Sequence, residues 1–322
     1  MEDLSVDPTF VSDLPYNGVK DSKWYHNGQY MINNGFPLQI DLELNLTCNF
    51  NCIMCIRDSI KTKKQYMDLE TVYDLINQCG ENKMESIKFQ YRGEPLLYPD
   101  FINVIKKAKE NNLFVHFNTN GSLLDLEMIK ALIFSGLDKI IISIESMFPH
   151  IYNQIRVGGN FDKLLANITN LRFLRDSYEK EKPIIEVFAT VQETNKREIE
   201  EGIFSTFWKN LADSITIAEC FDLYDNTEDD IELPNWHCGQ LWQRLIVLVD
   251  GEVIPCCAGI DYKDSVVYNM GNINKSTIEE IWNCHKLEKI RELHSEGKSH
   301  KVEMCRKCRL RKSVIRKRGV KL

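Results

Sequence analysis

The sequence lacks several features that would assign it to a common class of protein. It has no run of about 18 apolar residues, so a membrane-spanning helix is not expected. Its N-terminus is acidic and lacks the apolar segment of a secretory signal. The formal net charge of −7 gives no reason to expect bulk binding to nucleic acid. These absences predict a cytoplasmic protein with neither a membrane nor a nucleic acid as partner.

Cysteine, by contrast, is abundant. Eleven cysteines occur in 322 residues. In the cytosol thiols stay reduced, so clustered cysteines there are more often metal ligands or catalysts than disulfides. Three lie close together, and six occupy the last third of the chain: Cys48, Cys52 and Cys55, then Cys238, Cys256, Cys257, Cys284, Cys305 and Cys308. This distribution predicts two metal sites, one in each part of the chain.

Between residue 37 and about residue 218, strand-like and helix-like segments alternate six times. Six such units predict a parallel sheet with crossover helices, either a partial barrel or an open doubly wound sheet. In both folds ligands bind at the carboxyl ends of the strands. The first cysteine cluster follows the first strand, which places its thiols at that end.

Several individual elements are expected from local patterns. Helices are expected over 161–181, ended by Pro183, and over 196–211. A third helix over 276–297 would begin with a capping box from Ser276 to Glu279. A β-hairpin is expected around Asp250-Gly251, and the basic C-terminal tail is expected to be solvated.

The stretch "LTCNFNCIMCIRD" contains Cys48, Cys52 and Cys55 in a CxxxCxxC spacing. Three thiolates can hold three irons of a 4Fe–4S cluster and leave the fourth iron open to a substrate or cofactor. The alternative from spacing alone is a zinc site completed by a remote ligand.

This loop resembles that of the radical S-adenosylmethionine (radical SAM) enzymes, in which the open iron chelates the amino and carboxylate groups of SAM. "YRGEPLLYPD" is similar to the family's GGEPL motif, with Arg92 in place of the first glycine. The resemblance implies that Gly93 and Glu94 contact the cofactor, since glycine permits close approach and a carboxylate complements an ammonium group. The alternative is a simple Gly-Glu-Pro turn.

Three further segments resemble the family's cofactor contacts. Asn118 lies in "NTNG" and Ser143 and Glu145 lie in "SIES", each at a strand end. Arg156 resembles an arginine that often pairs with the cofactor carboxylate, which suits its bidentate guanidinium. Capping or turn formation is the alternative for each. Met54 stands where the family often has an aromatic residue.

The C-terminal third resembles the SPASM and shorter Twitch extensions of these enzymes. The resemblance assigns Cys238, Cys256, Cys305 and Cys308 to one auxiliary 4Fe–4S cluster; a zinc ribbon is the alternative. It also makes Cys257 a candidate hydrogen-atom donor to a substrate radical, as against an alternative ligand or a small buried residue.

The implied fold is α/β, a partial (β/α)6 TIM-like barrel followed by a small cysteine-rich α+β SPASM/Twitch domain. The expected organisation is an N-terminal extension (1–36), the barrel (37–220), an acidic linker (221–237) and the auxiliary-cluster domain with its basic tail (238–322).

The resemblance implies an enzyme that cleaves SAM to a 5′-deoxyadenosyl radical and uses two 4Fe–4S clusters. Residues 1–36 are too few for the leader-binding module of many peptide-modifying relatives. We therefore expect a small polar substrate, such as a sugar, aminoglycoside or nucleotide sugar, with oxidation or epimerisation as the reaction and a flavodoxin or ferredoxin as electron donor. The alternatives are modification of a ribosomally made peptide and a non-catalytic iron–sulfur or zinc protein for electron transfer or binding.

Overall fold

The computed structural model describes residues 22–57, 65–219, 230–262 and 264–318, and the chain divides into two compact units. The barrel unit comprises Leu42–Asp58 and Lys63–Cys220; the cysteine-rich unit comprises Met1–Asp41, Ser59–Thr62 and Phe221–Leu322. Residues 1–21 of the predicted extension and 220–229 at the predicted linker lie outside the described residues.

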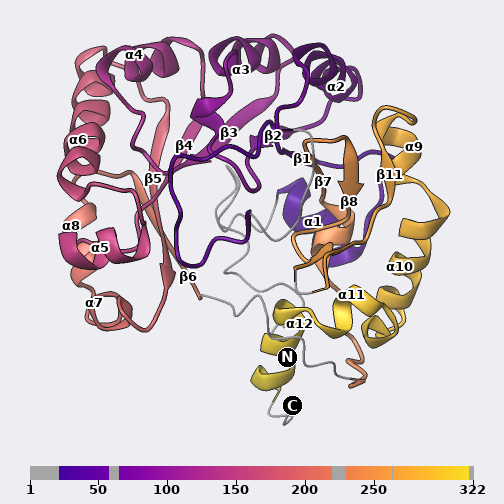
Figure 1. Ribbon diagram of the computed structural model, residues 1–322. Helices are drawn as coiled ribbons and strands as arrows, with labels where there is room; N and C mark the ends of the chain where they lie inside the picture. The colour runs from indigo at the N-terminus through magenta and orange to yellow at the C-terminus, as the bar shows by residue number, and fades with distance from the viewer. Residues whose placement is uncertain (1–21, 58–64, 220–229, 263, 319–322) are drawn as a thin grey trace. The chain divides into compact units, whose positions relative to one another are not determined.

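A parallel sheet forms the centre of the barrel unit (Figure 1). Strands β2 to β6 pair in chain order, and each pair is parallel. They are β2 (Ser86–Phe89), β3 (Phe114–Thr119), β4 (Lys139–Ser143), β5 (Ile184–Val191) and β6 (Ser214–Glu219). Strand β1 (Gln39–Leu42) leads into this unit, where the Leu42 carbonyl accepts a hydrogen bond from the Gln90 amide at 3.1 Å. The predicted partial (β/α)6 barrel is confirmed.

Helices cover the outer face of this sheet (Figure 1). They are α2 (Leu69–Glu81), α3 (Phe101–Glu110), α4 (Leu126–Phe134), α5 (Pro149–Ile155), α6 (Phe161–Ser177), α7 (Lys196–Glu200) and α8 (Ile203–Trp208), with a short 3-10 helix, η3 (Pro95–Leu97), after β2. The core fills the space between the two layers. For example, the Phe101 ring packs edge-on against Phe89 and Phe117, at centroid distances of 5.7 and 4.9 Å. In the described part of the chain, no helix has the length and apolar character needed to cross a bilayer.

Two predicted helices of this unit end earlier than their patterns indicated. The helix expected over 196–211 is divided into α7 and α8 at Gly202, whose φ of 71° lies in the left-handed region. Helix α6 ends at Ser177, and the following Tyr178 amide bonds back to the Leu174 carbonyl. The chain has therefore left the helix before Pro183, which is not the residue that stops it.

The cysteine-rich unit contains short strands and helices. They are α1 (Lys23–Tyr30), η4 (Gly239–Trp242), β7 (Arg244–Val247), β8 (Glu252–Ile254), β9 (Ile260–Asp261), β10 (Val266–Val267), β11 (Gly271–Asn272), α9 (Ile278–Trp282), α10 (His285–Ser295), η5 (Ser299–Lys301), α11 (Glu303–Arg306) and α12 (Arg309–Lys317). The predicted hairpin is confirmed, since β7 and β8 are antiparallel and Gly251 turns between them with φ 86°.

The capping box predicted at Ser276 and Glu279 is wrong by one residue. The Thr277 hydroxyl accepts from the Glu280 amide, and the Glu280 carboxylate accepts from the Thr277 amide. The expected single helix is also interrupted at Asn283, so that Cys284 becomes the N-cap of α10. Adjacent serine and threonine are both good caps, and local sequence alone does not choose between them.

The expectation of a solvated basic tail holds for exposed Arg316 and Lys317 and is wrong for the other, partly or fully buried, residues of 309–317. Residues 309–317 form α12, in which Arg311 is fully buried beside buried Val314 and Ile315. The Arg311 guanidinium donates to the Ser299 hydroxyl at 3.0 Å and to the Ile231 carbonyl. Burial of a guanidinium is tolerated here because protein acceptors replace water.

Candidate active site and auxiliary metal centre

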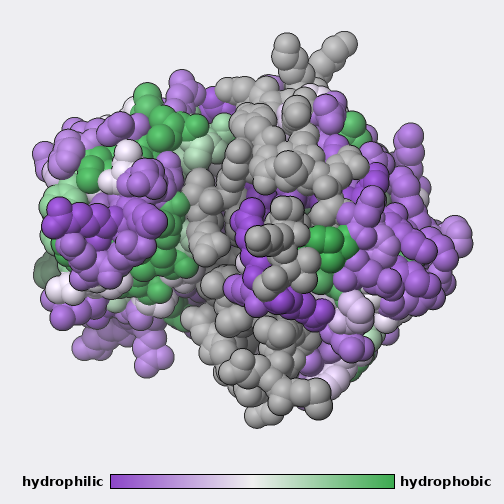
Figure 2. All heavy atoms as spheres, turned by 90° about the horizontal axis from the view of Figure 1, so that it is seen from below, coloured by the Kyte–Doolittle hydropathy of each residue, from purple (hydrophilic) through white to green (hydrophobic). Residues whose placement is uncertain are grey.

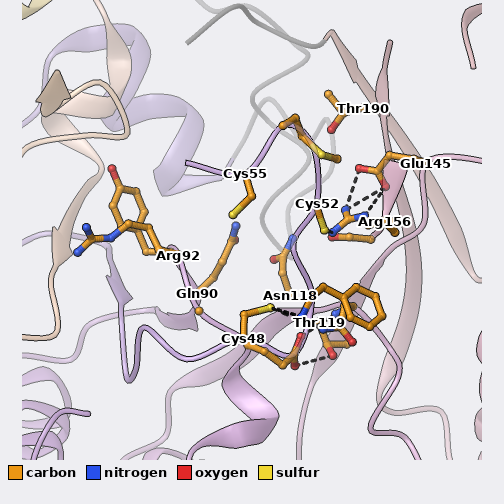
Figure 3. Close-up of a pocket in the computed structure, with 17 residues that line it drawn as sticks. Cys48, Cys52, Cys55, Gln90, Arg92, Asn118, Thr119, Glu145, Arg156 and Thr190 are labelled. Carbon is orange, nitrogen blue, oxygen red and sulfur yellow. Dashed lines mark hydrogen bonds and ion pairs between the residues drawn. The ribbon is translucent and has the colours of Figure 1, made fainter. Parts of the chain in front are cut away.

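A pocket of about 240 Å³ lies within the barrel unit (Figure 3). Its walls come from the cysteine loop and from the carboxyl ends of the strands that follow it. All three loop cysteines and all six residues predicted to contact the cofactor line this one pocket: Cys48, Cys52, Cys55, Gly93, Glu94, Asn118, Ser143, Glu145 and Arg156. The placement agrees with the rule that parallel α/β sheets bind ligands at their strands' carboxyl ends.

The cysteine loop is held by a segment that the sequence analysis had not linked to it. The Asn51 amide donates to the Val157 carbonyl at 2.8 Å, and the Ile53 amide donates to the Ile155 carbonyl at 3.1 Å. At Gly158, φ is 97°, and an added Cβ would lie 3.2 Å from the Asn49 carbonyl oxygen. The chain after α5 is thus built to lie against the loop.

The three thiols differ in exposure. Cys48 and Cys52 are partly buried and Cys55 is exposed. Burial is the main cause that raises the pKa of Cys48 and of Cys52. For Cys52 the Arg156 guanidinium, 3.6 Å from its sulfur, lowers the pKa and so opposes this effect. Within the described ranges no three histidine, cysteine or acidic side chains converge as the ligands of a single ion. A 4Fe–4S cluster does not need its ligands to converge on a single ion, because each thiolate binds a different iron. Three thiols around one pocket therefore suit a 4Fe–4S cluster.

The Glu94 carboxylate, predicted to contact the cofactor, is buried and already accepts hydrogen bonds from protein groups. Its carboxylate accepts from the Thr119 hydroxyl at 2.7 Å, the Asn120 amide at 2.8 Å and the Leu96 amide at 3.3 Å. Burial raises its pKa, and these hydrogen bonds oppose that effect. In this structure Glu94 ties the end of β2 to the end of β3, so its carboxylate orders the pocket wall.

Gly93 is required by the loop that precedes the cysteines. An added Cβ would lie 2.1 Å from the Asn45 carbonyl oxygen, far inside van der Waals contact. The chain is also fixed there, since the Glu94 amide donates to the Thr47 carbonyl at 2.8 Å and the Asn45 side chain donates to the Glu94 carbonyl at 3.1 Å. The glycine therefore lets two backbone segments meet beside the thiols.

A Gly93→Ala variant is expected to lower the free energy of unfolding by about 1–3 kcal/mol, because the methyl group meets backbone that cannot move aside. It should also weaken SAM binding about tenfold or more, since the cysteine loop must shift. Apparent Tm and anaerobic equilibrium dialysis with SAM measure the two effects. Gly202→Ala is the control for SAM binding: its added Cβ meets open space, so it should leave SAM binding unchanged, although its φ of 71° makes the alanine cost some stability. Parent-like SAM binding by Gly93→Ala would contradict this account.

Arg92, which replaces the first glycine of the family motif, points away from the thiols (Figure 3). It forms a buried bidentate pair with Glu43, at 2.7 and 2.8 Å. The substitution is therefore balanced by a carboxylate on the chain leaving β1.

Glu145 and Arg156 form a second buried pair, directly beside the cysteine loop (Figure 3). The guanidinium reaches both carboxylate oxygens, at 2.8 and 3.1 Å, and its other terminal nitrogen faces the Cys52 sulfur. Glu145 adopts a φ of 73°, and the Asn195 amide group holds its carbonyl at 2.8 Å. A strained backbone fixed in this way is common at functional sites. The Arg156 guanidinium was predicted to bind the carboxylate of the cofactor, but in this structure it binds the Glu145 carboxylate.

Asn118 and Ser143 also line the pocket. The Asn118 side-chain oxygen is buried and has no hydrogen-bond partner among the described residues. A buried acceptor left open in a pocket suits a ligand that donates a hydrogen bond.

A network of amide side chains around the cysteine loop was not predicted from the sequence. Asn120 donates to Asn49 at 2.9 Å, Asn49 donates to the Ser122 hydroxyl at 2.8 Å, and that hydroxyl donates back to Asn120 at 2.6 Å. The sequence signals were Asn49, directly after Cys48, and Asn120, directly before Gly121. Of the two asparagines in "NTNG", only Asn118 was predicted to belong to the site.

The cysteine-rich unit brings the four predicted auxiliary ligands together. Burial is the largest cause that raises the pKa of each of these four thiols, and nearby cysteines of the group also raise the pKa of Cys238, Cys256 and Cys305. For Cys238 the pKa rises to about 12. Buried thiols of this kind ionise readily only when cations compensate them, so the donor set fits an iron–sulfur cluster.

Cys257 lies next to this group and is exposed. Its sulfur is 4.0 Å from the Gln240 side-chain oxygen. Its role as a hydrogen-atom donor stays a prediction.

Comparisons with known proteins match the two parts of the chain that contain the residues of these two sites. The model of the Radical SAM superfamily matches residues 42–174, and the SPASM model, described as an iron-sulfur cluster-binding domain, matches residues 238–309.

Two curated relatives match most of the chain. The tungsten-containing aldehyde ferredoxin oxidoreductase cofactor-modifying protein of Pyrococcus furiosus is 24% identical over 314 residues, covering 84% of this chain and 86% of that protein. The PqqA peptide cyclase of Gluconobacter oxydans is 25% identical over 305 residues, covering 84% and 82%. Among solved structures, native anSMEcpe with bound AdoMet and Cp18Cys peptide has a TM-score of 0.60 at 19% identity, covering 85% and 86%, which is a likeness of fold.

Proposed function

The chain belongs to the radical SAM superfamily and carries a SPASM auxiliary-cluster domain, and on that premise we propose that it modifies a ribosomally made peptide. The observation that carries the proposal is the similarity to a peptide cyclase along 84% of this chain. A peptide substrate, which was the alternative in the sequence analysis, thus has more support than the small polar substrate that was expected first. Oxidation and epimerisation remain two of the reactions open to it.

The cofactors of this enzyme are SAM and two 4Fe–4S clusters. When bound, SAM and the first cluster supply a 5′-deoxyadenosyl radical that abstracts hydrogen from a C–H bond. We assign the first cluster to Cys48, Cys52 and Cys55, and the auxiliary cluster to the four cysteines of the other unit. The open acceptor of Asn118, together with the backbone before Gly93, would receive the donor groups of SAM.

The surrounding residues keep this arrangement rigid. Glu94 joins the ends of β2 and β3, and Arg156 fixes Glu145 while donating toward Cys52. A site whose side chains are already oriented costs little reorganisation when the cofactor binds. One-electron reduction of the first cluster requires a donor, for which we propose a flavodoxin or ferredoxin.

The experiment compares substrate classes under anaerobic conditions. The reconstituted enzyme receives SAM, dithionite and either synthetic peptides encoded next to its gene or a panel of aminocyclitols and nucleotide sugars. We expect a peptide to stimulate 5′-deoxyadenosine formation and to change in mass. Stimulation by the small molecules alone would overturn the peptide proposal and restore the first expectation. If 5′-deoxyadenosine forms without substrate and neither class stimulates it, the radical chemistry stands and both substrate classes are contradicted.

A further inference from the structure

His294 lies on the buried face of α10. This helix is amphipathic: Leu287, Arg291 and His294 are buried on one side, and hydrophilic residues cover the other side, at the right of Figure 2. Only 1% of His294 is exposed. A histidine buried to this extent needs hydrogen-bond partners for both ring nitrogens.

Both partners of His294 belong to assigned ligands of the auxiliary cluster. The Cys238 backbone amide donates to His294 Nδ1 at 3.2 Å, and His294 Nε2 lies 3.3 Å from the Cys305 sulfur. A backbone amide can only donate, so Nδ1 carries no hydrogen. The ring is therefore neutral with its hydrogen on Nε2, and it donates an N–H···S hydrogen bond to Cys305.

The environment strengthens this contact. Cys305 packs in an apolar cluster with Cys256, Val302 and Met304, and the Trp236 ring lies 5.9 Å from the His294 ring. A hydrogen bond in such low-dielectric surroundings is stronger than one in water. The histidine also joins two ligands that are far apart in the chain, one at the start of η4 and the other in α11.

We propose that His294 is a positioning residue of the auxiliary cluster, which holds Cys238 and Cys305 in register and raises the cluster's reduction potential through its Nε2–H. Hydrogen bonds to ligand sulfur withdraw negative charge from the cluster and so favour its one-electron reduced form. The inference rests on the auxiliary-cluster assignment within the proposed function, and it is independent of the substrate.

The test uses the full-length chain with Cys48, Cys52 and Cys55 changed to alanine, so that the auxiliary cluster alone reports. In this background, His294→Phe removes both hydrogen bonds, whereas His294→Gln keeps an amide that can donate toward Cys305. His285→Gln is the matched control, since His285 is exposed at the start of the same helix. Each variant is analysed for iron and then poised at a series of potentials, with the reduced cluster measured by EPR.

We expect the background chain and His285→Gln to share one midpoint potential, His294→Phe to have a more negative one, and His294→Gln to lie near the background value. A loss of iron in His294→Phe alone, with iron retained in His294→Gln, would also support the positioning role. An unchanged midpoint in an iron-replete His294→Phe variant would overturn the proposal.

A second readout does not depend on the stability of the phenylalanine variant. In the background chain labelled with ¹⁵N-histidine, ENDOR of the reduced cluster should show a weak ¹⁵N coupling that disappears in His294→Gln and persists in His285→Gln. Absence of that coupling from the background chain would overturn the proposal. Neither readout contains SAM or a substrate, so failure of the peptide proposal leaves both results unaffected.

Discussion

A Cys52→Ala variant is expected to form no 5′-deoxyadenosine while keeping its auxiliary cluster. Cys52 is the middle ligand of the loop and the one whose sulfur faces Arg156. With two thiolates left, the loop lacks the three that a cluster with one open iron needs. Iron should fall from about eight to about four per chain. Anaerobic iron analysis and chromatography of the SAM products measure both changes.

Cys284→Ala provides the matched control. Cys284 is a partly buried N-cap residue of α10, in the cysteine-rich unit, and we assign it to neither cluster. This variant should keep about eight irons and the parent rate of 5′-deoxyadenosine formation. Undiminished SAM cleavage by Cys52→Ala, or equal iron loss in both variants, would show that the loop assignment is wrong.

The second large effect is expected from Glu145→Ala. The Glu145 carboxylate is fully buried, and the Arg156 side chain is only 14% exposed. Removing the carboxylate leaves a buried guanidinium without its partner, which costs about 3–5 kcal/mol of folding free energy. At about 2–4 °C per kcal/mol, the apparent Tm should fall by roughly 6–20 °C. SAM cleavage should fall as well, because Arg156 loses the contact that holds it beside Cys52.

Two companion variants make this prediction specific. Glu145→Gln keeps an oxygen acceptor for Arg156 and should lose less stability than Glu145→Ala. Glu127→Ala breaks the exposed pair with Lys130, whose side chains are 84% and 40% exposed, and should change stability by less than about 1 kcal/mol. Equal Tm values for Glu145→Ala and Glu127→Ala would contradict the proposed role of the buried pair.

The order of elements and the position of the cysteine loop were predictable because both follow from short-range patterns. Strand–helix alternation specifies a parallel sheet, and a loop after the first strand must then lie at the sheet's carboxyl edge. The same reasoning placed Asn118 and Ser143 at strand ends. Arg156 follows α5 and was chosen from the family resemblance. All three line one pocket.

What could not be predicted depends on partners distant in sequence. Glu94 is held by residues on β3 and the loop after it, and the fork of Arg156 is engaged by Glu145 on the preceding loop. Local sequence shows a carboxylate or a guanidinium but not what it meets. Arg311 is a similar case. A basic residue in a basic tail is expected to be solvated, and only the fold brings it the hydrogen-bond acceptors that allow its burial.

The substrate could not be predicted from the sequence for a different reason. The described pocket is lined by the cysteine loop and by residues predicted to contact SAM, and these residues carry no information about the substrate. The first expectation, a small polar substrate, relied on the short segment before the first strand, and similarity along the chain supports peptide modification instead.

The central claim is that the three-cysteine loop leaves one iron for the amino and carboxylate groups of SAM. ENDOR of the reduced, iron-replete enzyme with SAM carrying ¹⁵N in its amino group tests this claim most directly. We predict a strong ¹⁵N coupling that is absent with unlabelled SAM and absent from the Cys52→Ala variant. A fully loaded enzyme that binds SAM but shows no ¹⁵N coupling would contradict the account.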